Sequence, residues 1–322
     1  MVLFVDKVAV IGAGTMGARI AEIFALNGKQ VVLKDIEQKF VDKGMETIKG
    51  DLDELVSFHM GKADKEIARI EKMGVRLTDE QKATVKKANR PTYTQDRAAK
   101  AIEKITATTK YEDVAGANLV IEAVVERMDV KKKVFGELSR VVDSRCVFAT
   151  NTSALPVTEM AKATDRPNRF VGTHFFNPPT QLPLVEIIPA ETSDEETVMD
   201  VTNVIAELRN HRYPMAPVRV KETPGFLVNR VLGAMMNEVF LCHEEKIASP
   251  RDIDVAMQAG AGFPMGPLAL ADLVGLDVIQ HVQQTLKPFM ENRPKKTATV
   301  VDDLVKQGRL GKKNGKGFFD YP

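Results

Sequence analysis

The sequence predicts an α/β protein: a wound, mainly parallel sheet with a helical hairpin insertion, followed by an all-helical C-terminal domain. Two observations carry this prediction. Strand-like and helical patterns alternate up to about residue 221, and strand-like patterns then stop. The chain has 322 residues, which is long for one hydrophobic core. We therefore expect two domains, residues 1–221 and 222–322.

A dinucleotide-binding fingerprint lies near the N-terminus. Residues 8–11 form a short β-branched run that predicts a buried strand. Gly12, Gly14 and Gly17 follow in the spacing G-x-G-x-x-G, and a helical stretch leads to a second strand that ends at Asp35. Because strand, glycines, helix, strand and acid fall within about thirty residues, the segment predicts a Rossmann-like domain.

Each glycine of this turn has a separate expected role. Gly12 permits the tight turn, Gly14 lets a pyrophosphate approach the backbone, and Gly17 lets helix and strand pack closely. Thr15 and Met16 complete the predicted cofactor-binding turn at the helix N-terminus, whose free N–H groups attract phosphate. The alternative is a glycine-rich turn that binds no ligand.

Asp35 predicts which dinucleotide binds. Its carboxylate is expected to accept hydrogen bonds from the adenosine ribose and to repel a 2′-phosphate, which favours NAD over NADP. The neighbouring Lys34 weakens that preference slightly.

A long polar stretch follows, and residues 40–104 predict a protruding hairpin of two or three helices. One interpretation of its many charges is a solvated face. The other is a lid or clamp whose lysines meet phosphate groups on a large substrate.

Strand-like runs resume after the hairpin, at residues 104–109, 119–124, 146–151, 169–175, 184–188 and 216–220. Ligands of wound parallel sheets bind beyond the carboxyl ends of the strands. Those ends carry Gly12, Asp35, Glu126, Asn151 with Ser153, and His174.

Residues 222–322 read as helices throughout. Thr223 with Pro224, and Ser249 with Pro250, are expected to cap and begin two of them. The apolar surface of this part is broader than a small domain readily hides, and it predicts a homodimer contact. Its members are Leu232, Met235, Met236, Phe240 and Leu241.

A histidine and a glutamate lie in two neighbouring apolar runs. If residues 169–175 and 184–188 are antiparallel around a turn centred on Thr180, His174 and Glu186 lie opposite each other. A carboxylate beside an imidazole fixes the ring proton, as in general acid–base catalysis. The alternative is a structural bridge without catalytic work.

Composition narrows the function class. The net charge of +1 gives no strong field for nucleic acid or an acidic membrane. Two cysteines suit a reducing, cytoplasmic location, and no apolar run has the length of a membrane span. No His, Cys or Asp cluster has metal-ligand spacing. His59 and His211 lie in polar stretches and are expected at the surface.

Six segments, in this order along nearly the whole chain, resemble the L-3-hydroxyacyl-CoA dehydrogenase family, including its 3-hydroxybutyryl-CoA dehydrogenases. They are GAGTMG, EAVVERMDVK, NTSALPVTEMA, HFFNPPTQLPLVEII, ETPGFLVNR and LGKKNGKGFFDY. The resemblance implies NAD-dependent oxidation of a coenzyme A thioester in fatty-acid β-oxidation. Two departures stand out: the hairpin is longer than the usual family form, and a few extra residues surround RNHRYPMAPV.

The resemblance also implies site residues. His174 matches the catalytic base and Glu186 the carboxylate that pairs with it. Ser153 matches a serine near the substrate hydroxyl or thioester, and Asn229 matches an asparagine that polarises the substrate oxygen. For Asn229 the alternative role is helix or turn capping.

Further positions match cofactor contacts of the family. They are Glu126, Lys131, Asn177 and Lys313, with Asn151 assigned to the nicotinamide side. Capping is the alternative role for Asn177, and a surface charge is the alternative for Glu126, Lys131 and Lys313.

The expected reaction is oxidation of a short-chain L-3-hydroxyacyl-CoA, such as 3-hydroxybutyryl-CoA, to the 3-ketoacyl-CoA with NAD. Three alternatives remain open. The chain could oxidise a sugar acid or small hydroxy acid, sense NAD without catalysis, or form the dehydrogenase piece of a multifunctional fatty-acid oxidation protein.

Overall fold

The computed structural model describes residues 5–276, 279–280, 284, 304–310 and 314–316. Contacts divide the chain into two compact units, Met1–Leu232 and Gly233–Pro322. This division falls inside a helix, later in the chain than the predicted boundary at residue 221. That boundary therefore stays a prediction.

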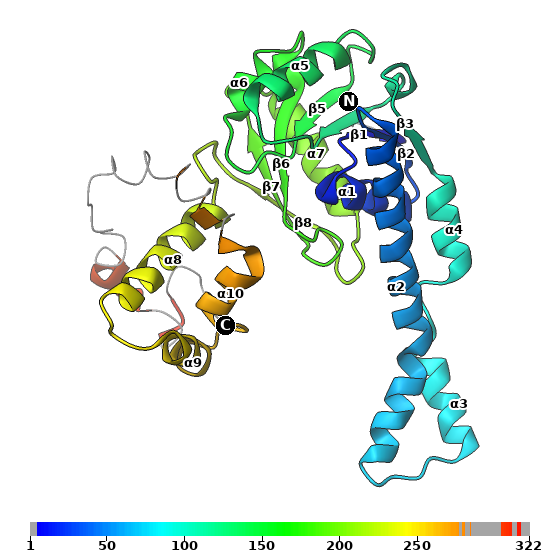
Figure 1. The fold of residues 1–322 in the computed structure, drawn as a ribbon, viewed down its shortest axis with the longest axis vertical. Helices are drawn as coiled ribbons and strands as arrows, with labels where there is room; N and C mark the ends of the chain where they lie inside the picture. The colour runs from blue at the N-terminus through cyan, green and yellow to red at the C-terminus, as the bar shows by residue number, and fades with distance from the viewer. Residues whose placement is uncertain (1–4, 277–278, 281–283, 285–303, 311–313, 317–322) are drawn as a thin grey trace. The chain divides into compact units, whose positions relative to one another are not determined.

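The first unit contains an eight-stranded sheet in the order β3-β2-β1-β4-β5-β6-β7-β8 (Figure 1). All neighbouring pairs are parallel except β6 and β7, which are antiparallel. The predicted wound, mainly parallel sheet is confirmed. The strands are β1 (Lys7–Ile11), β2 (Gln30–Lys34), β3 (Ile105–Thr108), β4 (Leu119–Glu122), β5 (Val147–Thr150), β6 (Phe170–Phe175), β7 (Leu184–Pro189) and β8 (Ala216–Arg219).

Helices cover both faces of this sheet, and each face has its own apolar core. The larger core contains side chains of α1 (Thr15–Leu26), α2 (Gln38–Lys72), α4 (Gln95–Glu103) and α7 (Glu195–Glu207). The second core contains side chains of α5 (Met128–Leu138), α6 (Val157–Ala161) and the 3-10 turn η1 (Glu112–Val114). A further 3-10 turn, η2 (Pro167–Arg169), leads into β6. The six inner strands are buried along nearly their whole length, and their sequences are mostly continuous apolar runs, whereas the edge strands β3 and β8 are largely exposed.

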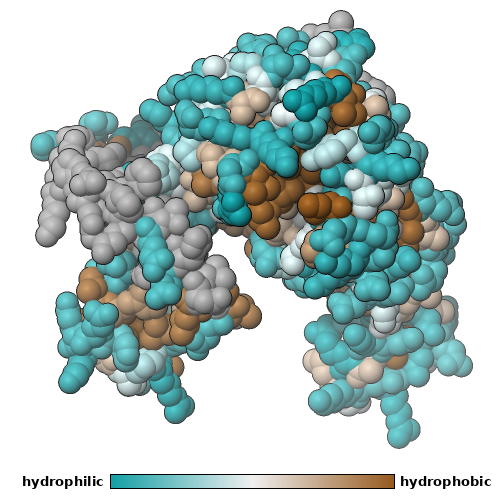
Figure 2. Space-filling model, turned by 45° about the horizontal axis from the view of Figure 1, so that its top comes forward, coloured by the Kyte–Doolittle hydropathy of each residue, from teal (hydrophilic) through white to brown (hydrophobic). Residues whose placement is uncertain are grey.

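The predicted insertion is a helical hairpin that extends away from the sheet (Figure 1). The first half of α2 is anchored by buried residues such as Ile48 and Leu52, whereas Ile67 is the only buried residue beyond Val56 in this helix. Its partner α3 (Asp79–Ala88) buries no residue and begins with a capping box formed by Thr78 and Gln81. The visible surface of the hairpin is mostly hydrophilic (Figure 2).

The second unit contains most of α8 (Val228–Glu244), with α9 (Pro250–Ala261) and α10 (Pro267–Val274). Ser249 caps α9 as predicted, accepting the backbone N–H of Asp252. Thr223 does not cap α8, so that prediction is wrong. A turn containing Phe226, with φ of +49°, intervenes, and the helix begins at Val228.

Hydrophobic residues are visible on the surface of this second unit (Figure 2). Of the five residues predicted to form an apolar surface, Met236 is buried and Leu241 is exposed. In the described part of the chain, no helix is both long and apolar enough to cross a bilayer.

Candidate active site

The glycine turn has the shape that a dinucleotide requires. Gly12 has φ of +104°, and a Cβ there would lie 2.5 Å from the carbonyl oxygen of Ala123. A Cβ at Gly17 would lie 1.8 Å from the carbonyl oxygen of Gly12. A Cβ at Gly14 would meet nothing within 4 Å, so the backbone there is open to a ligand. The turn leads directly into α1, whose N-cap is Gly14. The residues present fit the pyrophosphate of NAD.

Asp35 follows β2 and holds this turn in place. Its Oδ2 accepts the backbone N–H of Ala13 at 2.6 Å, and its Oδ1 accepts that of Ile36 at 2.6 Å. The Lys34 ammonium lies 3.6 Å from the centre of the Tyr111 ring. Burial lowers the pKa of Lys34, and the nearby Asp35 opposes that effect. Lys34 is therefore engaged by an aromatic ring rather than free beside the ribose position.

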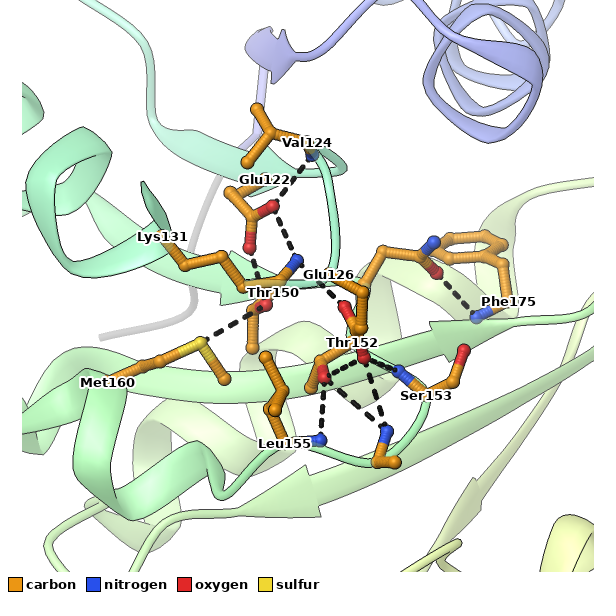
Figure 3. Close-up of polar contacts among 12 residues, drawn as sticks. Glu122, Val124, Glu126, Lys131, Thr150, Thr152, Ser153, Leu155, Met160 and Phe175 are labelled. Carbon is orange, nitrogen blue, oxygen red and sulfur yellow. Dashed lines mark hydrogen bonds and ion pairs between the residues drawn. The ribbon is translucent and has the colours of Figure 1, made fainter. Parts of the chain in front are cut away.

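A buried ion-pair network lies at the carboxyl ends of β4 and β5 (Figure 3). The Lys131 ammonium is 2.7 Å from Glu122 Oε1 and 3.1 Å from Glu126 Oε2, and its side chain is 1% exposed. Glu122 is also fully buried and accepts the Thr150 hydroxyl at 2.6 Å and the Val124 N–H at 2.7 Å. A buried charge needs such partners. The surface-charge alternative for Lys131 is therefore wrong.

Glu126 connects this network to the loop after β5 (Figure 3). Its Oε1 accepts the Thr152 hydroxyl at 2.5 Å and the Ser153 N–H at 2.8 Å. Burial raises the pKa of Glu126, but Lys131, Thr152 and Ser153 together outweigh it, and the net pKa lies below the ordinary value. Glu126 thus holds the backbone of the loop that carries Ser153, and Ser153 itself is exposed.

Asn151 ties the same loop to the next strand. Its Oδ1 accepts the backbone N–H of Phe175, the residue directly after His174, at 2.9 Å. The Asn151 carboxamide oxygen is therefore occupied, and its contact with nicotinamide stays a prediction.

His174 and Glu186 face each other across the antiparallel pair β6–β7, as the sequence predicted. Glu186 Oε2 lies 2.7 Å from His174 Nδ1. The imidazole is 5% exposed and lies near the rings of Phe176 and Phe226, with centroids 4.5 and 5.6 Å away. Among the described residues, no group hydrogen-bonds with His174 Nε2.

The start of α8 completes the surroundings of Glu186. Its Oε1 accepts the backbone N–H groups of Leu227 at 3.1 Å and Val228 at 2.9 Å. Free N–H groups at a helix start favour a negative charge. Asn229 is the next residue of this helix. It therefore follows directly after the two backbone amide groups that bind Glu186, the partner of His174.

The remaining predicted residues fall in different places. Asn177 is exposed in the connection between β6 and β7. Thr15 is exposed and Met16 is partly buried at the start of α1. Lys313 lies outside the described residues.

Sequence reasoning missed a second histidine–glutamate pair. His211 Nε2 lies 2.5 Å from Glu22 Oε1, with side chains 11% and 0% exposed. The prediction that His211 is a surface residue is therefore wrong. Burial raises the pKa of Glu22, partly offset by His211. The available signal was a glutamate within the otherwise apolar segment IAEIFAL of the fingerprint helix.

A cavity of about 540 Å³ adjoins this second pair. It lies in the first unit, between α1, the first half of α2, the β6–β7 connection and the loop after α7. Its basic lining side chains are Arg19, His59, His211 and Arg212, and Arg19 pairs with Asp51 at 2.6 Å.

Two family models cover almost the entire chain. The NAD-binding domain of 3-hydroxyacyl-CoA dehydrogenase matches residues 7–79 and 64–223, and the C-terminal domain of the same enzyme matches residues 225–321. The chain belongs to the 3-hydroxyacyl-CoA dehydrogenase family. It is an NAD-dependent dehydrogenase, and NAD is its cofactor.

Relatives in this family are similar over all or nearly all of this chain. A 3-hydroxybutyryl-CoA dehydrogenase of Bradyrhizobium diazoefficiens is 35% identical, over 100% of this chain and 97% of its own. A 3-hydroxyadipyl-CoA dehydrogenase of Escherichia coli is also 35% identical, over 100% of this chain and 60% of its own. The crystal structure of (S)-3-hydroxybutyryl-CoA dehydrogenase from Ralstonia eutropha matches with a TM-score of 0.75 at 34% identity, over 99% of this chain and 100% of that one.

Proposed function

We propose that this dehydrogenase oxidises a short-chain L-3-hydroxyacyl-CoA, such as 3-hydroxybutyryl-CoA, to the 3-ketoacyl-CoA, with His174 as the general base. The observation that carries the proposal is the buried His174–Glu186 pair, with 2.7 Å between Nδ1 and Oε2, at the carboxyl end of a strand in an NAD-binding sheet. In this arrangement we assign NAD binding to residues 1–221 and substrate binding and dimerisation to residues 222–322.

The pair determines where the imidazole proton resides. An ionised carboxylate only accepts hydrogen bonds, so Glu186 keeps a proton on His174 Nδ1. The lone pair on Nε2 then takes the proton of the 3-hydroxyl group as the C3–H bond breaks. NAD supplies the hydride acceptor when bound. The products are the 3-ketoacyl-CoA, NADH and one proton held on His174, which the same nitrogen returns in the reverse direction.

Two further side chains act on the substrate in this proposal. Ser153 contacts the 3-hydroxyl or thioester oxygen, supported by the exposed position of a loop that Glu126 holds rigidly. Asn229 polarises the same oxygen from the first turn of α8, next to the amide groups that bind Glu186. Glu126, Lys131, Asn177 and Lys313 remain proposed cofactor contacts.

The cavity beside α2 suits the coenzyme A part of the substrate. It adjoins the β6–β7 connection that follows His174, and basic side chains such as Arg212 line it. A coenzyme A thioester carries several phosphate charges, and guanidinium groups bind phosphate well.

The acyl chain length is tested by turnover. NADH formation is measured with 3-hydroxyacyl-CoA thioesters of increasing length, beside free hydroxy acids of the same lengths. The highest kcat/KM is expected for the four-carbon thioester, because similar proteins carry the name 3-hydroxybutyryl-CoA dehydrogenase. Faster oxidation of the free acids would overturn the substrate class.

The catalytic role of His174 is tested by His174→Ala. Loss of a general base is expected to lower kcat by roughly 10²–10⁴-fold, while NADH still binds. Near-normal turnover would remove His174 from the mechanism.

A homodimer through the C-terminal unit is part of the proposal. Among the described residues of that unit, Leu273 is 71% exposed and Ile247 is 66% exposed, and exposed apolar side chains of this kind are candidates for a contact between subunits. Sedimentation of the full chain as a monomer at micromolar concentration would contradict this.

A further inference from the structure

The second histidine–glutamate pair joins the cofactor helix to a loop that supports the active site. Glu22 lies in α1, fully buried, and its Oε1 meets His211 Nε2 at 2.5 Å. Its other carboxylate oxygen, Oε2, is buried and has no hydrogen-bond partner in the described structure. Such an oxygen is costly to keep, so the pair calls for an explanation beyond filling space.

Residues beside His211 hold the connection between β6 and β7. The backbone N–H of His211 donates to the Thr180 carbonyl at 3.0 Å. The Asn210 side chain, which is 0% exposed, donates to the Pro179 carbonyl at 3.2 Å. These two hydrogen bonds hold the consecutive carbonyl groups of Pro179 and Thr180, a few residues after His174.

The same connection carries Asn177, one of the proposed cofactor contacts, three residues after His174. Because hydride and proton leave the same carbinol in the proposed reaction, the part of NAD beside His174 is the nicotinamide half. Phe176 lies between Asn177 and the catalytic strand, and its ring centroid is 4.5 Å from that of His174. A shift of the Pro179–Thr180 turn would therefore move Asn177 and Phe176 together.

The loop after α7, which carries Asn210 and His211, is also held by hydrogen bonds that differ in kind from the Glu22–His211 contact. Asn27 exchanges two hydrogen bonds with the backbone of Arg209, at 2.8 and 3.1 Å, and the Tyr93 hydroxyl donates to the Asn210 carbonyl at 3.3 Å. These are neutral bonds. A bond between a carboxylate and an imidazole is charge-assisted and roughly twice as strong.

We propose that Glu22 and His211 are positioning residues: through Asn210 and His211 the pair fixes the β6–β7 connection, and with it the binding position for the nicotinamide half of NAD. The inference rests on the proposed contact of Asn177 with NAD. Neither Glu22 nor His211 touches the reacting atoms in this scheme.

The test compares two ligands of the same site. ADP-ribose shares with NADH the part that binds the glycine turn and Asp35, but it lacks nicotinamide. His211→Ala is expected to raise the Kd of NADH by roughly 2- to 30-fold, the range for residues that act through a network. The Kd of ADP-ribose should stay within about twofold, since the glycine turn is untouched. His211→Gln, whose amide N–H reaches toward Glu22, should restore most of the NADH affinity.

A stability control separates positioning from general weakening. Val142 is 6% exposed in the core on the opposite face of the sheet. Val142→Ala should lower the melting temperature and leave the ratio of the two dissociation constants at its wild-type value. If His211→Ala does not fold, His211→Phe, which keeps a ring but has no hydrogen-bonding nitrogen, replaces it in the same measurement.

A selective loss of NADH affinity supports the pair as a positioning device. An unchanged ratio of the two dissociation constants overturns it, whether both rise together or neither moves. Because these titrations need no acyl-CoA, failure of the proposed substrate class would appear separately: the wild-type protein would not turn over acyl-CoA substrates, while His211→Ala would still lose NADH affinity selectively.

Discussion

Replacing Glu186 with glutamine changes one atom in the buried pair and should disable the base. The carboxylate accepts three hydrogen bonds: from His174 Nδ1 at 2.7 Å, from the Leu227 N–H at 3.1 Å and from the Val228 N–H at 2.9 Å. A glutamine side chain offers one oxygen and one NH₂ group in their place. The two orientations of that amide have very different energies.

If the amide oxygen faces His174, its NH₂ group opposes two backbone N–H donors. Each buried donor without an acceptor costs about 1–3 kcal/mol, so this orientation is disfavoured by roughly 2–6 kcal/mol. In the other orientation the NH₂ group donates to His174 Nδ1, and the imidazole proton moves to Nε2. The nitrogen that should accept the substrate proton is then already protonated.

Glu186→Gln is therefore expected to lower kcat by roughly 10²–10⁴-fold, a general base's usual contribution. The assay is NADH formation from 3-hydroxybutyryl-CoA, with NADH affinity measured by fluorescence and expected to be unchanged. Glu222→Gln is the matched control, because Glu222 also accepts a backbone N–H, that of Thr158, but lies outside the proposed mechanism. If Glu186→Gln keeps kcat within about threefold of wild type, the tautomer argument fails.

Three further outcomes follow from the site and the core. The Glu126 carboxyl has a folded-state pKa below its ordinary 4.5, so it stabilises the fold above pH 4.5, and this contribution is lost as the pH falls through the lower value. The difference in free energy of unfolding between wild type and Glu126→Gln, measured in urea, should therefore become smaller on acidification, and a constant difference would contradict the pKa shift. Burial raises the pKa of Cys146 to about 12. Iodoacetamide should therefore label Cys242 but not Cys146 in the native protein, and both cysteines after denaturation. Rapid labelling of Cys146 in the native protein would show that its thiol is accessible. Asp35→Ala should reduce the preference for NAD over NADP, measured as the ratio of kcat/KM values, by roughly 10- to 100-fold, which corresponds to the free energy of one hydrogen bond to a charged group. An unchanged ratio would mean that another residue determines the cofactor preference.

The amino-acid sequence alone determined the local elements and the strand that carries His174. Short β-branched runs and spaced glycines depend on neighbouring residues, so the eight strands and the glycine turn could be predicted from periodicity. The opposition of His174 and Glu186 was also predicted, from two antiparallel strands around a turn centred on Thr180, and the observed register agrees with it.

Tertiary structure alone decided which charges lie inside. Lys131 and His211 stand in polar segments, and nothing local distinguishes them from solvated residues. Lys131 pairs with Glu122, nine positions away, only once β4 and α5 are in place. His211 is buried against a partner far away in the chain, since Glu22 meets it across 189 positions. Long-range contacts of this kind leave no periodic pattern in the sequence. The free-energy cost of burying a charge is offset by an opposite charge that only the folded structure brings near. The start of α8 at Val228 is a similar case, since its free amide groups are satisfied by Glu186 rather than by a neighbouring cap.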